Sequence, residues 1–170
     1  MIAVHILFSG GMRVRLLVMS DSHSRLSVME RIIESQPDAK DIFFLGDGIA
    51  QAEQLEYIYS DRKFYFVSGN CDFSSTQKTT DFITLAQNKI MFTHGHEYSV
   101  KRSIDKLVET AKCNKVKIVL YGHTHCAYTG YFDGIHVVNP GSVSRGVDGK
   151  CTYAVIDITD KGIIPLIITI

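Results

Sequence analysis

The chain has 170 residues, with 18 basic and 18 acidic side chains and a formal net charge of zero. It therefore lacks the excess of positive charge typical of nucleic-acid-binding proteins, and an anionic ligand must be held by local contacts. The four cysteines, Cys71, Cys113, Cys126 and Cys151, have no C-x-x-C spacing. Their pattern argues against a disulfide framework and predicts a reducing, cytoplasmic location.

The chain begins with a short apolar segment. Residues 2–8 lack a basic flank and a cleavage site and are too short to span a bilayer, so no membrane association is expected. Met12 follows a Ser-Gly-Gly sequence and is a second possible start. Residues 1–11 are therefore either an N-terminal extension or an accessory edge strand, and residues 12–170 are expected to form one domain.

The first half alternates strand patterns with helix patterns. Strands are predicted at residues 13–20, 41–45 and 64–67, and helices at 24–36 and 49–59. Each strand ends in Gly or Ser beside a side chain that can bind a metal: Asp21 and His23, then Asp47, then Asn70. Open α/β sheets bind ligands beyond the carboxyl ends of their strands, so one shared crevice is expected.

The second half is dominated by hairpin patterns. Hairpins are predicted at 82–93 with a turn at 87–89, at 127–138 with a turn at Asp133 and Gly134, and at 151–170, while 101–113 predicts a helix and 116–121 a strand. The strand before 94 ends in His94 and His96, and the strand before 122 leads to His123 and His125. These elements predict an α/β fold in which mixed β-sheets pack as a sandwich flanked by helices.

Five of the seven histidines stand at strand ends next to Gly or Ser. One such histidine is usually structural, but five together indicate a metal site. Oxygen and imidazole ligands without thiolate suit Mn, Fe, Ni or Zn in a hydrolytic centre.

The motifs D-x-H, G-D, G-N-x-D, H-x-H and G-H-x-H follow one another between residues 13 and 145. In this order they resemble the calcineurin-like metallophosphoesterases. The short chain, its G-N-C-D motif and the segment 139–142 are similar to the small YfcE-like phosphodiesterase subfamily. The resemblance implies a four-layer metallophosphoesterase fold and two divalent metal ions, Mn²⁺ in the first place, with Ni²⁺, Fe²⁺ and Zn²⁺ as alternatives.

The resemblance also implies a role for each motif residue. One metal is assigned to Asp21, His23 and His125, and the other to Asn70, His94 and His123, with Asp47 bridging the two. In such sites the ions lie about 3.5–4 Å apart, and a bridging hydroxide attacks the phosphorus in line. His96 is the alternative to His94; otherwise it is expected to contact the substrate or a ligand.

Four more residues are weaker candidates. Cys71 stands where the wider family often has a histidine; it either lines the site or, in the favoured interpretation, is a small buried thiol. A thiol is a poor acid toward an alkoxide, so leaving groups that need no proton should be preferred. Asp72 is expected to orient a ligand or a turn. Arg25 and Arg145 either bind a phosphate oxygen or are simply solvated.

The sequence therefore predicts a two-metal phosphoesterase acting on small substrates, most specifically a phosphodiesterase. The alternatives are a phosphomonoesterase or nucleotidase, and a non-catalytic scaffold of the type of the eukaryotic retromer subunit, which resembles these enzymes. A scaffold does not need seven intact ligands, so catalysis is favoured. Residues 2–8 and 163–170 are both apolar, so either a homodimer or higher oligomer covers them or they pair within one subunit.

Overall fold

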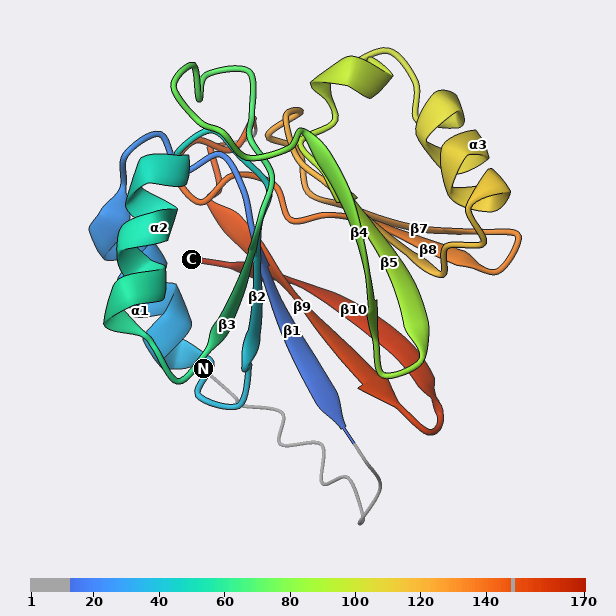
Figure 1. Cartoon of the computed structure of the whole chain (residues 1–170), viewed down its shortest axis with the longest axis horizontal. Coiled ribbons are helices and arrows are strands. Elements are labelled where there is room, and N and C mark those ends of the chain that lie inside the picture. The colour runs from blue at the N-terminus through green and yellow to red at the C-terminus, as the bar shows by residue number, and fades with distance from the viewer. Residues whose placement is uncertain (1–12, 148) are drawn as a thin grey trace.

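The structure is a computed structural model of the chain and describes residues 13–147 and 149–170. Two five-stranded sheets face each other, and helices cover both outer faces (Figure 1). The expected fold class, mixed sheets packed face to face and flanked by helices, is confirmed. The leader at residues 1–11 lies outside the described residues, so its two interpretations stay open.

The first sheet has the strand order β10-β9-β1-β2-β3. Its strands are β1 (Val14–Met19), β2 (Asp41–Phe44), β3 (Lys63–Phe66), β9 (Thr152–Thr159) and β10 (Gly162–Thr169). β1, β2 and β3 run parallel, whereas β9 and β10 are antiparallel to their neighbours. The helices α1 (Leu26–Ser35) and α2 (Ile49–Ile58) lie on its outer face.

The second sheet has the strand order β4-β5-β6-β8-β7. Its strands are β4 (Thr80–Leu85), β5 (Asn88–Thr93), β6 (Ile118–Tyr121), β7 (Tyr128–Phe132) and β8 (Ile135–Asn139). β5, β6 and β8 run parallel, and β4 and β7 flank them antiparallel. The helix α3 (Asp105–Cys113) covers its outer face, after a 3₁₀ turn η1 (His96–Tyr98).

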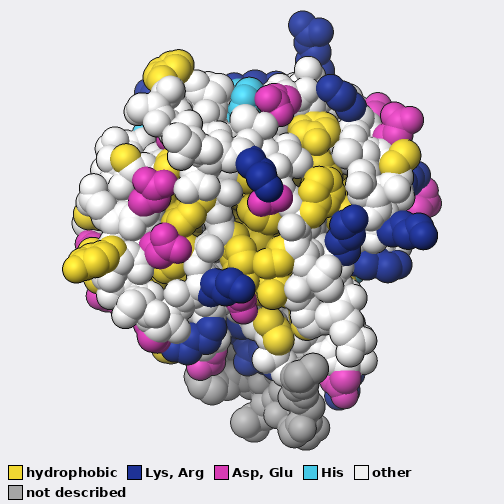
Figure 2. All heavy atoms as spheres, viewed as in Figure 1, with side chains coloured by type: hydrophobic (Ala, Val, Ile, Leu, Met, Phe, Trp, Pro, Cys, Tyr) yellow, Lys and Arg dark blue, Asp and Glu magenta, His cyan; other side chains and the backbone are white. Residues whose placement is uncertain are grey.

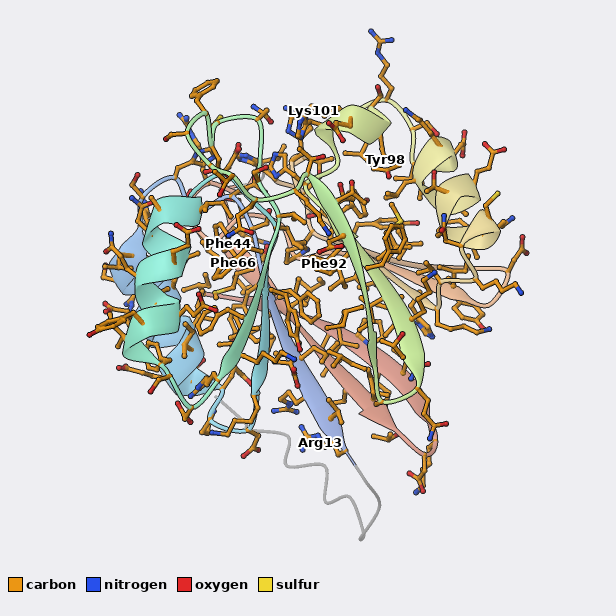
Figure 3. All side chains as sticks on the ribbon, viewed as in Figure 1. Arg13, Phe44, Phe66, Phe92, Tyr98 and Lys101 are labelled. Carbon is orange, nitrogen blue, oxygen red and sulfur yellow. The ribbon has the colours of Figure 1, made fainter. Side chains whose placement is uncertain are left out.

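The core has three apolar layers, and β1 contributes to two of them. Leu17 and Met19 pack against α1 and α2, while Leu16 and Val18 point into the space between the sheets. Burial of both faces explains why β1 is a continuous apolar run rather than an alternating one. Figure 3 labels Phe92, which belongs to the layer between the sheets.

Several predicted boundaries shift by one or two residues, and two of the differences have a clear physical reason. The turn of the first hairpin lies at Ala86 and Gln87, both with positive φ, rather than at 87–89, because Asn88 pairs with Leu85 and already belongs to the strand. The third helix begins at Asp105 rather than 101. Ser99, with a φ of 56°, ends η1 in a left-handed conformation, so the chain turns before it can enter the helix.

β10 is an edge strand with an apolar outer face. Ile164 and Leu166 are 39% and 44% exposed. The predicted cover for these side chains is either a second copy of the chain or residues 2–8. Neither belongs to the described structure, so the dimer stays a prediction. Figure 2 shows further hydrophobic side chains between β3 and β4, the two edge strands on the viewed side of the sandwich. In the described residues no helix is long and apolar enough to cross a membrane.

Asp157 on β9 holds Arg13, which directly precedes β1, and Arg15 of β1 on the helix-covered side of the first sheet. Its Oδ1 accepts from the Nε atoms of Arg13 and Arg15 at 3.0 and 2.8 Å, and its Oδ2 accepts from the second nitrogen of each at 3.1 and 2.8 Å. The carboxylate is 5% exposed and the two arginine side chains 27% and 22%. These bidentate contacts join β1 to β9 and fix their register.

We expect Asp157→Asn to lower the free energy of unfolding by about 2–3 kcal/mol, because an amide leaves two half-buried guanidinium groups without their shared charge. Urea denaturation would measure the change. Asp133→Asn is the matched control, since it removes an exposed ion pair with Lys112 and should leave the midpoint unchanged. Equal midpoints for the two variants would contradict the structural role of Asp157.

Candidate metal centre

The candidate ligands meet because parallel strands end at the same edge of a sheet. Asp21, Asp47 and Asn70 follow β1, β2 and β3, and His94 and His123 follow β5 and β6. The loops after these strands gather at one end of the sandwich, the end where Figure 3 labels Lys101. Five loops distant in sequence are thereby brought to one place.

Asp21 lies at the centre of this cluster and is fully buried. Its Oδ2 accepts from the Ser20 hydroxyl at 2.6 Å and from the backbone N–H of His123 at 3.1 Å. Its Oδ1 has no conventional donor, and His125 Nε2 lies 3.1 Å away. Since Nδ1 of His125 donates to the carbonyl of Arg145, the neutral ring presents a lone pair to Oδ1. Two acceptors this close need a proton or a cation between them.

His94 presents a second set of lone pairs. Its buried ring donates from Nδ1 to the carbonyl of Leu45 at 2.6 Å, which leaves Nε2 as the acceptor. Nε2 lies 3.2 Å from both Asn70 Oδ1 and His123 Nδ1 and 3.7 Å from Asp47 Oδ1. Two of these neighbours, the oxygens of Asn70 and Asp47, are acceptors, and a cation among them would relieve their repulsion with the lone pair of Nε2.

The ligand atoms form two groups, each within 4.8 Å: Asp21, His23 and His125, and Asp21, Asp47 and His94. Asp21 belongs to both groups, and Asp47 belongs to the group that contains His94. Asn70 and His123 join through their contacts with His94. The structure thus brings together all seven residues expected from the sequence, and their carboxylate, amide and imidazole donors fit divalent transition-metal ions.

Comparison with known proteins gives the same family as the motifs. A model of the calcineurin-like phosphoesterase superfamily domain matches residues 14–161. The chain belongs to this family. It is a metal-dependent phosphoesterase and hence a hydrolase, as the sequence predicted.

Three similar proteins illustrate the relationship. The phosphodiesterase YfcE of Escherichia coli K12 is 27% identical over 168 residues, covering 85% of this chain and 88% of YfcE. A predicted phosphoesterase of Streptococcus pneumoniae TIGR4 is 28% identical, with a TM-score of 0.81 over 93% of this chain and 90% of that one. The vacuolar protein sorting 29 protein of Cryptosporidium parvum shares the fold, with a TM-score of 0.72, 15% identity and coverage of 93% and 98%.

The protonation of the metallophosphoesterase site follows from its geometry. Burial raises the pKa of Asp21, but the contact with His125, with help from His94 and Ser20, outweighs it and holds this pKa below the ordinary value. The same contact raises the pKa of His125. A proton is therefore favoured between these side chains, in the position that a metal cation would take instead.

The pKa of His123 is shifted in the opposite direction to that of His125. Burial, followed by the charges of His94 and Lys101, lowers the pKa of His123 to about 4. The ring is therefore neutral over the physiological range. A neutral imidazole is the form that binds metals, so His123 needs to release no proton on binding.

Backbone strain is concentrated at the same residues. Five of the seven have φ in the left-handed region, which side chains rarely adopt: Asp21 (54°), His23 (42°), Asp47 (57°), His123 (68°) and His125 (56°). Each such residue costs about 1–3 kcal/mol and persists only when the surrounding structure enforces it. The strained backbone at these positions directs the side chains toward one site.

Two motif glycines allow the loops to approach closely. A Cβ on Gly69 would lie 2.1 Å from Asp47 Oδ1, and one on Gly122 would lie 2.1 Å from the Ser20 hydroxyl. Both distances are far below van der Waals contact. The G-N and G-H motifs therefore need glycine because neighbouring loops occupy the space of a side chain.

Asp72 holds the loops in place. Its Oδ2 accepts from the backbone N–H groups of Asp47 and Gly69 at 2.7 and 2.8 Å, and its Oδ1 accepts from those of Gly48 and Ile49 at 2.8 and 3.0 Å. Ile49 is the first residue of α2, so the carboxylate also caps this helix. Of its two expected roles, the geometry supports orientation of backbone turns.

We expect Asp72→Asn to lower the free energy of unfolding by about 1–3 kcal/mol, because the amide keeps only one of two accepting oxygens. The loops that carry Asp47 and Asn70 should loosen, which weakens Mn²⁺ binding. Thermal melts with and without Mn²⁺ would measure both effects. Asp61→Asn, at an exposed ion pair with Lys40, is the control; an Asp72 variant that melts and binds Mn²⁺ like this control would contradict the assignment.

The interpretation of Cys71 as a small buried thiol is wrong, because the side chain is exposed. Its backbone N–H donates to Asp47 Oδ1 at 2.8 Å. Partial burial and then the Asp47 carboxylate raise the pKa of the thiol to about 11, so it is neutral. Cys71 lines a cleft together with His23 and Asp47, which agrees with the alternative interpretation; its contact with a substrate stays a prediction.

The other weaker candidates belong to neither ligand group. The ring of His96 lies close to that of His94, with 5.4 Å between the ring centres, but His94 belongs to a ligand group and His96 does not, which favours His94 as the ligand. Arg25 and Arg145 both have exposed side chains. Arg145 contributes through its backbone carbonyl, which accepts from His125 at 2.9 Å.

The sequence did not single out Phe73 or Lys101. A cleft of about 370 Å³ opens from His23 and Asp47 between the first turn of α2 and the loop 71–75, and Phe73 lies on it, 94% exposed. Lys101, which follows η1 on the other sheet, lies near enough to affect the pKa of both His123 and His125. Phe73 directly follows the G-N-C-D motif, which was the only local signal for it.

Proposed function

We propose that this metallophosphoesterase hydrolyses phosphodiesters and that two divalent metal ions are its cofactors. The observation that carries the proposal is the convergence of acceptor atoms at the strand ends. Asp21 Oδ1 faces His125 Nε2 at 3.1 Å, and Asn70 Oδ1 faces His94 Nε2 at 3.2 Å. A cation can lie between the two atoms of each pair. The two pairs involve different residues of the cluster, so they suit two separate ions.

One ion is assigned to Asp21, His23 and His125, and the other to Asn70, His94 and His123, with Asp47 between them. Mn²⁺ is the proposed metal, and Ni²⁺, Fe²⁺ and Zn²⁺ are alternatives that the same donors accept. When bound, the ions polarise the phosphoryl oxygens and lower the pKa of a water that serves as the nucleophile for in-line displacement.

The chain itself orients the ligands and supplies little acid catalysis. The carbonyls of Leu45 and Arg145 fix the tautomers of His94 and His125, so that Nε2 of each ring faces the site. Cys71 is a neutral thiol at the edge of the cleft and a weak proton donor to an alkoxide. Esters whose leaving groups are stable anions should therefore react best. The name of the relative YfcE supports a diester rather than a monoester.

The proposal is tested by a screen of the metal-reconstituted protein with bis(p-nitrophenyl) phosphate, p-nitrophenyl phosphate and a cyclic nucleotide. Preference for the first supports the phosphodiesterase, and preference for the second supports the phosphomonoesterase. Absence of turnover with all four metals supports the scaffold alternative. The cytoplasmic location stays a prediction from the cysteine pattern.

We expect Asp47→Asn to lower turnover by more than about 100-fold while the fold remains intact. Loss of a residue that only supports a ligand costs about 10- to 100-fold, and loss of a shared carboxylate should cost more. Steady-state kinetics and metal analysis of the purified variant would measure this. Asp81→Asn, at an exposed ion pair with Lys78, is the control. A folded Asp47 variant with near wild-type turnover and two bound metals would refute the bridging role.

We expect Cys71→His to raise the hydrolysis of diesters with alkyl leaving groups more than that of p-nitrophenyl esters. An imidazole can protonate an alkoxide, and such help is worth up to about 10²–10⁴-fold, whereas p-nitrophenolate leaves without a proton. Rates across a leaving-group series would measure the effect. Cys113→His, at an exposed cysteine of α3, is the control. An equal effect on both ester types would contradict the role assigned to position 71.

A further inference from the structure

We propose that the cleft beside Asp47 binds the retained ester substituent of the substrate and selects a planar, uncharged group, such as an aryl ring or a nucleobase, that stacks on Phe73. This inference rests on the proposed phosphodiesterase function and adds a substrate class to it. The cleft opens directly from His23 and Asp47, so a group attached to a phosphorus atom at the ligand cluster can enter it.

Phe73 is presented by a braced loop rather than a loose one. The Asp72 carboxylate ties the loop to the backbone of Asp47 and α2, and the N–H of Ser75 donates to the carbonyl of Asp72 at 3.0 Å. Gln77 donates to Glu53 of α2 at 3.1 Å and accepts through its carbonyl from Ser68 at 2.9 Å. The backbone is thus fixed on both sides of Phe73, which keeps the exposed aromatic ring beside the cleft.

The cleft is built for a group without negative charge. The described residues that line it include Asp47, Glu53 and Asp72 but no Lys or Arg. The Asp72 carboxylate also occupies the N–H groups of Gly48 and Ile49, so the N-terminus of α2 is already neutralised. A second phosphate would meet carboxylates here and no compensating cation.

One positive charge near the site, that of Lys101, lies beside the loops of the second sheet. Lys101 acts on His123 and His125, which belong to the loops of the second sheet. A charged part of a substrate is therefore expected to turn toward Lys101, and the uncharged ring toward Phe73. Aromatic stacking adds binding energy beyond the area that it buries.

Kinetics test the inference with two substrates that share a leaving group. Bis(p-nitrophenyl) phosphate retains an aryl group after reaction, and methyl p-nitrophenyl phosphate retains a methyl group. Phe73→Ala should lower kcat/KM for the first by about three- to ten-fold and leave the second within about two-fold. Tyr57→Ala is the matched control, since Tyr57 is a similarly exposed aromatic residue of α2, at 89%, and does not line this cleft.

Equilibrium binding gives a readout independent of turnover. The chain contains no tryptophan, so Phe73→Trp introduces a single tryptophan on the cleft, which can be excited selectively over the tyrosines, and Tyr57→Trp places one elsewhere on α2. With Mn²⁺ present, phenylphosphonate should change the fluorescence of the first variant and bind at least about three-fold more tightly than methylphosphonate. The fluorescence of the second variant should not change.

The outcomes separate this inference from the proposed function. If the wild type hydrolyses both diesters and Phe73→Ala changes them equally or not at all, the cleft assignment fails and the function stands. If the wild type hydrolyses neither, the function fails, and the binding assay decides the cleft. The cleft assignment is then supported if phenylphosphonate binds more tightly than methylphosphonate and changes the fluorescence of the Phe73→Trp variant but not of the Tyr57→Trp variant. Equal affinity for the two phosphonates overturns the assignment.

Discussion

The structure depends on holding several lone-pair-bearing atoms close together at one end of a sandwich. The buried carboxylate of Asp21 is the centre of this arrangement, and its desolvation is offset on one oxygen by Ser20 and the backbone of His123. The other oxygen faces an imidazole. The backbone carbonyl of Asp21 is also fixed, because the hydroxyls of Ser142 and Ser144 donate to it at 2.8 and 2.9 Å. Both the side chain and the backbone of Asp21 are therefore held in place by hydrogen bonds.

This requirement explains features that are otherwise unfavourable. Left-handed backbone at the tips and glycines pressed against neighbouring loops both reduce stability, yet they occur where loops from the two sheets must meet. The fold compensates with bracing contacts outside the ligands. Asn139, the last residue of β8, donates to the carbonyl of Gly122 and to Thr124, each at 3.0 Å, and so holds the loop between His123 and His125. Such contacts keep the ligands in position before any ion binds.

The site is asymmetric although the two sheets are alike in size. The loops of the first sheet form the walls of an acidic and aromatic cleft, whereas the loops of the second contribute histidines and Lys101. Substrate selection can therefore reside in the short loop after β3 rather than in a separate cap. A vacuolar protein sorting 29 protein shares this fold at 15% identity, so the sandwich by itself does not identify a function. The function has to be argued from the side chains of the loops.

Local sequence determined most of the framework. Apolar periodicity identified the strands and helices, and the order of the motifs identified the seven side chains that the structure brings together, because parallel strands necessarily end at a common edge. Hairpin and helix boundaries shifted where pairing register and the left-handed Ser99 overrode local preference. The exposure of Cys71, the four contacts of Asp72, and the positions of Phe73 and Lys101 depended on which loops lie beside each other. Only the tertiary structure decided these, because a side chain's surroundings come from residues far away in sequence.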